Sequence, residues 1–131
     1  MNGHTPPREI RNEVQLRLPE SLRSHVDPSS LSFAPPGWTN ELEQMHLRLA
    51  AIEPQYRLAE VKEKFGRLRV YLPGKPRMDA ALNGVIEEYE RRSAQVCQEC
   101  GAPGCSRAEP GRRIATLCDS CHGVVETDAN S

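Results

Sequence analysis

Four of the five cysteines in this chain form two C-x-x-C pairs, and this spacing restricts the fold more than any other feature of the sequence. The first pair is Cys97 and Cys100, the second is Cys118 and Cys121, and residues 101–117 separate them. A C-x-x-C turn places two thiolates on one side of a tetrahedral zinc ion, so the intervening chain has to double back to supply the other two. We predict a zinc ribbon or knuckle over residues 97–123, with a returning strand before Cys118.

Four protein thiolates would fill a tetrahedral site, whereas a catalytic zinc keeps one position open for water. We therefore expect a structural Zn²⁺ that contributes folding energy to a small core. The ligand set stays open in two respects, because Cys105 is a fifth thiol between the pairs and His122 directly follows Cys121. Two unrelated pairs of buried thiols, or a redox-active pair, are the alternatives to a metal site.

The composition favours a cytoplasmic protein without a membrane span. An odd number of cysteines suits a disulfide framework poorly, and C-x-x-C pairs bind metal in a reducing compartment. No apolar run approaches the roughly 20 residues needed to cross a bilayer, and the first residues lack the plan of a signal peptide. The formal net charge of -1 argues against a histone-like nucleic-acid binder but not against a local basic face. No cluster of residues indicates a small-molecule substrate.

The N-terminal arm is expected to be partly disordered, with a short strand pattern before Pro19 and one or two helical turns from Glu20. This order is similar to the start of a ribbon-helix-helix DNA-binding arm. A linker that begins at Asp27-Pro28 follows where the second helix of that motif is required, so an edge strand and a turn are the simpler interpretation. We divide the chain into an arm, a body, the metal module and a disordered tail: residues 1–36, 37–96, 97–123 and 124–131.

The body is predicted to be an α-β-β-α unit, and the whole an α+β fold. A helix begins after Trp38 and ends before Pro54, because apolar residues recur along it at steps of three and four: Leu42, Met45, Leu49 and Ile52. A β-hairpin follows over residues 56–72, with Gly66 at its turn. An amphipathic helix of about 18 residues then begins near Pro76, and its apolar stripe consists of Met78, Leu82, Val85, Ile86, Tyr89 and Val96.

Side chains alternate across a strand, so the hairpin is predicted to have one buried and one basic face. The buried face is expected to contain Ala59, Val61, Phe65, Leu68, Val70 and Leu72. The candidate nucleic-acid-binding residues on the opposite face are Lys62, Lys64, Arg67, Arg69 and Tyr71. The cations would meet phosphates, and the tyrosine ring would stack on a base. A solvated strand face, with Glu60 and Glu63 offsetting the positive charge, explains the same pattern.

A resemblance covers roughly residues 37–123. Its motifs are Gly37-Trp38, the hairpin sequence VKEKFGRLRVY, Ser93, the CGAPG sequence that begins at Cys100, and a Leu-Cys-Asp sequence at the second cysteine pair. These motifs resemble a family of small, functionally uncharacterised proteins of bacteria and their phages. Cys121 stands where that family often has histidine, an exchange that keeps a zinc ligand. The resemblance implies an α-β-β-α body with a zinc knuckle and supplies no activity.

Three functions are compatible with these features. A non-enzymatic zinc module that binds nucleic acid is the first, and a protein–protein adaptor, such as a phage-type modulator of a host factor, is the second. The third is a degenerate HNH-like nuclease, because residues 115–122 are similar to the closing half of zinc-bearing HNH endonucleases. However, residues 101–117 contain no histidine to act as general base, and His4, His25 and His46 are scattered. We predict that the protein is not an enzyme and binds nucleic acid or a protein partner.

Overall fold

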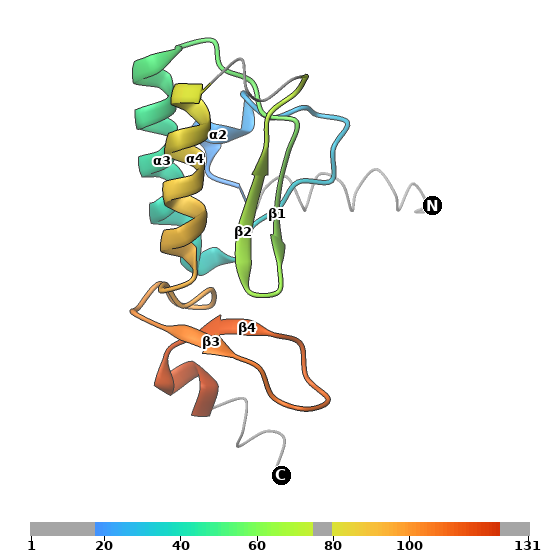
Figure 1. The fold of residues 1–131 in the computed structure, drawn as a ribbon, viewed down its shortest axis with the longest axis vertical. Coiled ribbons are helices and arrows are strands. Elements are labelled where there is room, and N and C mark those ends of the chain that lie inside the picture. Colours follow the sequence, from blue (N-terminus) through green and yellow to red (C-terminus); the bar gives the residue numbers. More distant parts are fainter. Residues whose placement is uncertain (1–17, 75–79, 124–131) are drawn as a thin grey trace, which may run out of the picture.

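The computed structural model describes residues 18–74 and 80–123, and their arrangement confirms the predicted α+β fold (Figure 1). Two helices and a hairpin form the body, and a smaller unit with the four cysteines follows it. The elements in chain order are α2 (Glu20–Arg23), η1 (Pro36–Trp38), α3 (Thr39–Ile52), β1 (Glu60–Lys64), β2 (Arg67–Tyr71), α4 (Ala80–Ser93), β3 (Cys105–Arg107) and β4 (Ala115–Leu117).

The body is a layer of two helices packed against a two-stranded antiparallel hairpin. Helices α3 and α4 lie side by side, and α4 packs against β2 (Figure 1). The core combines the apolar stripes of both helices with the inner face of the hairpin, and it includes Trp38, Leu42, Met45, Leu49, Val61, Leu68, Val85, Ile86 and Tyr89. Ile52, expected in the stripe of α3, is the last residue of that helix and is 46% exposed.

Both edges of the hairpin are hydrogen-bonded to neighbouring elements. On the β1 edge, the Val61 N–H donates to Ser32 Oγ at 2.8 Å, and the Val61 carbonyl accepts from Phe33 at 2.9 Å. On the β2 edge, the Leu68 N–H donates to Ser93 Oγ at 2.9 Å. The Val70 N–H donates to a carboxylate oxygen of Glu90 at 3.0 Å. An exposed edge is a template for pairing with another chain, so these contacts leave the flat outer face as the accessible surface of the hairpin.

The segment before residue 37 is packed more extensively than the predicted arm. Leu18, Leu22, Val26 and Ala34 belong to the same core as α3 and α4. The core of the body therefore extends to residues before position 37, because apolar side chains within residues 18–34 pack against the two helices and the hairpin. The predicted strand at Val14 and Leu16, and the tail at 124–131, lie outside the described residues.

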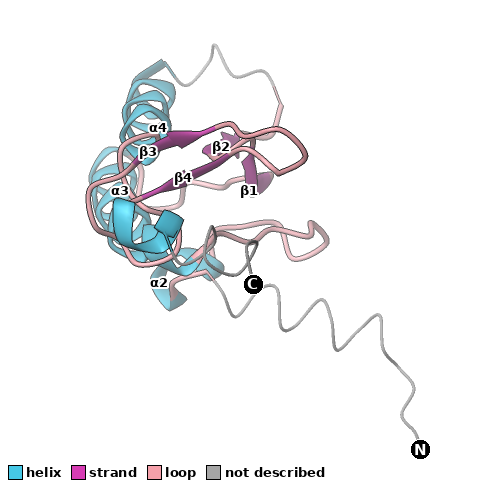
Figure 2. Ribbon diagram, turned by 90° about the horizontal axis from the view of Figure 1, so that it is seen from below, coloured by secondary structure: helices cyan, strands magenta, loops and turns pink. Residues whose placement is uncertain are grey.

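The second body helix, α4, is described over Ala80–Ser93, and it has the predicted apolar stripe except at its ends. Pro76 and Met78 lie outside the described residues, and Val96 follows the helix, packed against the core. Seen from below, the β3–β4 hairpin lies across the turn of the β1–β2 hairpin (Figure 2). The cysteine module is therefore in direct contact with the body.

Candidate metal centre

The first cysteine pair lies in a tight knuckle directly after α4. The Cys97 N–H donates to the Ala102 carbonyl at 2.7 Å, and the Gly101 N–H donates to the Cys97 carbonyl at 2.8 Å. Gly101 has φ +86°, a left-handed conformation that is open to glycine at little cost. The Cys-Gln-Glu-Cys-Gly order thus closes the loop and turns both thiols to the same side.

The second pair lies at the start of a short helix, which directly follows the predicted returning strand. Strands β3 and β4 pair antiparallel, with Cys105 opposite Leu117, and return the chain to the first pair. Residues 119–123 are helical, the His122 N–H donates to the Cys118 carbonyl at 2.9 Å, and the Cys121 N–H donates to Cys118 Sγ at 3.4 Å. Cys118 therefore occupies the capping position of this helix, and its sulfur accepts the Cys121 N–H.

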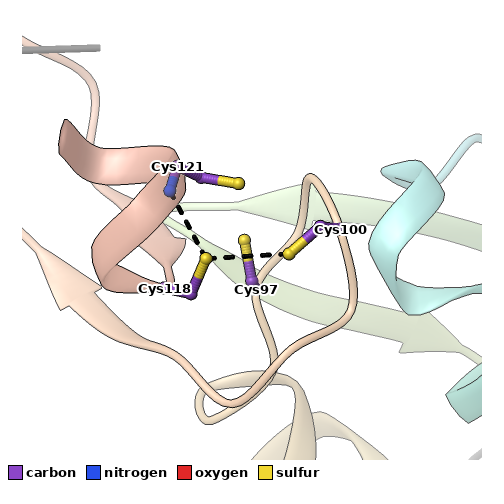
Figure 3. Close-up of side chains that lie close together, drawn as sticks. All are labelled: Cys97, Cys100, Cys118 and Cys121. Carbon is purple, nitrogen blue, oxygen red and sulfur yellow. Dashed lines mark hydrogen bonds between the residues drawn. The ribbon is translucent and has the colours of Figure 1, made fainter. Parts of the chain in front are cut away.

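The four sulfur atoms converge on one point between the knuckle and this helix (Figure 3). All of them lie within 4.8 Å of one another, and the Sγ atoms of Cys100 and Cys118 are 3.6 Å apart. A tetrahedral ion with metal–sulfur bonds of about 2.3 Å requires sulfur atoms about 3.8 Å apart, whereas a disulfide requires about 2.05 Å. The four thiols have the spacing of a metal site, and none of them is in a disulfide.

The electrostatics of the cluster favour a bound cation. Burial raises the pKa of Cys97. Backbone hydrogen bonds from Cys118, Cys100 and Glu99 together lower it by more than burial raises it, and the resulting pKa is about 6. Hydrogen bonds of the Cys121 thiol with Cys118 and Cys97, together with burial, favour its protonated form and raise its pKa to about 12; the negative charge of Cys97 adds to this effect. A divalent cation removes this conflict and allows all four thiols to ionise.

The two alternative ligands lie outside the cluster. Cys105 is exposed on β3, and His122 Nε2 lies 3.1 Å from a carboxylate oxygen of Glu109. Within residues 18–74 and 80–123, one cluster of His, Cys, Asp or Glu side chains lies close enough together to hold a metal. This cluster consists of Cys97, Cys100, Cys118 and Cys121. The structure thus brings together the four predicted ligands.

Replacing His122 with alanine is expected to leave the metal content at one ion per chain. The imidazole is directed to Glu109, on the loop between β3 and β4, so its loss removes that contact and none of the four thiols. Metal analysis of the purified variant by mass spectrometry tests this expectation. A variant without bound metal would place His122 among the ligands.

The metal module is hydrogen-bonded to the body at two places. At the knuckle, the Gly37 N–H donates to the Gln98 carbonyl at 2.9 Å, and Trp38 Nε1 donates at 2.9 Å to the carbonyl of Val96, the residue directly before Cys97. At the other place, Thr116 Oγ1 on β4 donates to the Gly66 carbonyl in the turn of the body hairpin at 2.6 Å. A metal that fixes the knuckle and β4 therefore also fixes the position of that turn.

The five predicted nucleic-acid-binding residues lie on one face of the body hairpin. In the observed register Lys62 is opposite Arg69, Lys64 is opposite Arg67, and Tyr71 is opposite Glu60. The Lys62 ammonium lies 3.4 Å from Glu60 and 5.5 Å from the centre of the Tyr71 ring. The predicted shared face is therefore present, with one carboxylate on it.

Two residues of the hairpin differ from the prediction. Phe65, expected on the buried face, is 64% exposed, because it is the first residue of a two-residue turn and not the last residue of β1. The Glu63 side chain is 7% exposed; its carboxylate accepts the Gly66 N–H at 2.7 Å and lies 3.5 Å from Arg113. The Phe-Gly pair was the available signal, since glycine is favoured at the second position of such a turn.

A cluster of two histidines and a tyrosine was not anticipated from the sequence. The rings of His25 and Tyr56 are stacked 4.0 Å apart, and His46 Nδ1 lies 2.7 Å from the Tyr56 hydroxyl. Burial and the neighbouring His25 lower the pKa of His46, and burial raises the pKa of Tyr56. These shifts favour the neutral forms of His46 and Tyr56, and the cluster joins the segment before α3 to that helix.

Comparisons of the chain with models of protein families, with curated proteins and with solved structures give no match. The resemblance to a family of bacterial and phage proteins therefore stays a prediction. In the described part of the chain, no helix combines the length and the apolar character that crossing a membrane requires.

Proposed function

We propose that this chain is a non-enzymatic, zinc-stabilised module that binds nucleic acid through the outer face of its β1–β2 hairpin. Tetrahedral sites of four thiolates typically bind Zn²⁺, which has no redox chemistry of its own. Because the four cysteines would fill such a site, the metal has a structural role.

The proposal rests on one observation, the two like-charge pairs across the hairpin. Lys62 faces Arg69 and Lys64 faces Arg67 in direct register. Like charges directly opposite one another destabilise a sheet, typically by a few tenths of a kcal/mol to about 1 kcal/mol. Opposite charges at these paired positions would stabilise the hairpin instead. Phosphates placed over the hairpin would turn this repulsion into attraction.

The position of Glu63 also supports a nucleic-acid partner. Its carboxylate is buried on the opposite side of the hairpin, so it does not offset the cations of the outer face. Glu60 is then the single acidic residue among the paired strand positions of that face. Arg67 Nε donates to the Glu90 carbonyl at 3.3 Å, so this side chain also contacts the C-terminal part of α4.

The nuclease alternative has no support among the described residues. His122, the histidine nearest the metal site, is paired with Glu109 and follows a cysteine that faces the cluster. A protein–protein adaptor would use the same face for an acidic segment, and binding assays with nucleic acid separate the two functions.

Exchanging Lys64 for glutamate is expected to weaken nucleic-acid binding and to stabilise the hairpin. The new carboxylate would face Arg67, so the free energy of unfolding should rise by a few tenths of a kcal/mol. Binding should also depend less on salt. The slope of the logarithm of the binding constant against the logarithm of salt concentration should decrease in magnitude by about 1 for each lost phosphate contact. Fluorescence anisotropy with labelled DNA and RNA, and urea unfolding, measure the two effects.

Arg91→Glu provides the matched control, because it makes the same change in net charge at an exposed position of α4. Its affinity for nucleic acid should stay within about twofold of the wild type, since Arg91 is not among the residues of the outer face, all of which are on β1 and β2. If both variants bind as the wild type does, or if the wild type binds no nucleic acid at low salt, the proposed function is wrong.

A further inference from the structure

The turn of the body hairpin presents an aromatic side chain to solvent at a backbone position that disfavours it. Phe65 has φ +56° and Gly66 has φ +79°, the two positive values of a type I′ turn. Asparagine followed by glycine is the favoured pair in such a turn, and a bulky residue at positive φ is an outlier. Phe65 is also 64% exposed, so neither backbone geometry nor burial explains a phenylalanine here.

The surroundings of Phe65 form a basic groove between the body and the metal module. A pocket of about 350 Å³ lies beside its ring, lined by Glu63, Lys64, Phe65, Arg112, Arg113 and Ile114. The Lys64 ammonium lies 5.7 Å from the centre of the Phe65 ring. Both oxygens of the Glu63 carboxylate have partners, the Gly66 N–H and Arg113, so the acid is compensated by its neighbours.

A second exposed aromatic residue lies at the other end of the hairpin, on its outer face. Tyr71 is 43% exposed and has the Lys62 ammonium 5.5 Å from its ring centre. Five residue steps from Gly66 to Tyr71 span about 17 Å at the rise of an extended strand. The hairpin thus has an exposed aromatic ring with an adjacent lysine at each end, and Arg67 and Arg69 lie on the strand between them.

From this arrangement we infer that the partner is a single-stranded nucleic acid, with Phe65 as the principal stacking platform at the groove. This inference rests on the proposed function and specifies its substrate class. Exposed aromatic rings interleaved with cations bind unpaired bases and phosphates together, without regard to sequence. A duplex keeps its bases stacked on one another, so it would use the cations alone and leave both rings without a role.

Anisotropy titrations with about 15-nucleotide DNA and RNA single strands and the matched duplex test the inference. We expect the wild type to bind at least one of the single strands about tenfold more tightly than the duplex at the same salt concentration. Phe65→Asn should lower that affinity about tenfold and leave the salt slope and the duplex affinity unchanged, because it removes stacking and no charge. Phe65→Tyr, which keeps a ring, should retain the wild-type affinity.

Thermal unfolding shows whether Phe65→Asn acts through binding or through the fold. Because asparagine followed by glycine suits the turn, the midpoint should rise, by about 4 °C. Weaker binding together with higher stability would support a role of Phe65 in recognition. Equal affinity for single strands and duplex, with no effect of Phe65→Asn, would overturn the inference and leave the proposed function standing. Absence of binding to all three probes would overturn both, and binding of an acidic peptide instead would favour the adaptor.

Discussion

Exchanging Cys97 for serine is expected to eliminate stoichiometric metal and to unfold the C-terminal module. Cys97 is fully buried, and its thiol is the one whose pKa is lowered by several backbone hydrogen bonds. Structural zinc sites of four cysteines contribute on the order of 10 kcal/mol of binding free energy to folding, so loss of one ligand should remove several kcal/mol. Elemental analysis and urea unfolding of the variant measure both effects.

Cys105→Ser is the control for this experiment, because it makes the same chemical change at the exposed cysteine outside the cluster. This variant should retain one metal ion per chain and the wild-type midpoint in urea. Treatment of the wild type with a strong chelator should reproduce the effect of Cys97→Ser. A metal-free protein that unfolds at the same urea concentration as the untreated protein would contradict a structural role of the metal.

The metal site could be predicted because its geometry is mostly local. Two cysteines separated by two residues, followed by Gly101 in a left-handed conformation, fix a knuckle with few long-range contacts. The start of a helix at the second pair was less evident, since Asp119, Ser120 and Gly123 give a weak signal over a short length. The pairing of the two halves follows from tetrahedral coordination and not from chain propensity.

The packing of residues 18–36 and the orientation of Phe65 could not be predicted for two different reasons. Leu22 and Ala34 reach the core through contacts with distant elements, and no local pattern encodes such contacts. Whether Phe65 is buried or exposed depends on the residue at which the turn begins, because a shift of one residue moves a side chain to the other side of the hairpin. Continuing the alternation from Val61 through Phe65 treated a turn residue as a strand residue.

The metal centre and the proposed binding face are connected through β4. Thr116 lies between the knuckle and the hairpin turn. Its N–H donates to Gln98 Oε1 at 2.9 Å, and its hydroxyl donates to the Gly66 carbonyl at 2.6 Å. Arg112 and Arg113 precede β4 on the same loop and line the groove at Phe65. Removal of the metal should therefore weaken nucleic-acid binding as well as stability, although no ligand of the metal belongs to the basic face.

Gly37→Ala is expected to destabilise the protein by about 3 kcal/mol or more, through a collision between the body and the knuckle. A Cβ atom at residue 37 would lie 2.1 Å from the Cys97 carbonyl oxygen, 2.7 Å from the Gln98 carbonyl carbon and 2.8 Å from the Gly101 nitrogen. All three are backbone atoms of the loop that holds the first two thiols, so no side-chain rotation relieves the contact. The loop would have to move, which would also weaken the metal site.

The same substitution at Gly84 provides the matched control. Gly84 lies inside α4, and a Cβ there would have open space around it. Alanine is favoured over glycine in a helix interior by roughly 1 kcal/mol, so Gly84→Ala should raise the free energy of unfolding by that amount. In urea unfolding, Gly37→Ala should be less stable than the wild type and Gly84→Ala more stable. In metal analysis, the metal content should be reduced in Gly37→Ala alone. Equal stability of the two variants would mean that the body and the knuckle are not in the close contact that places the metal centre against α3.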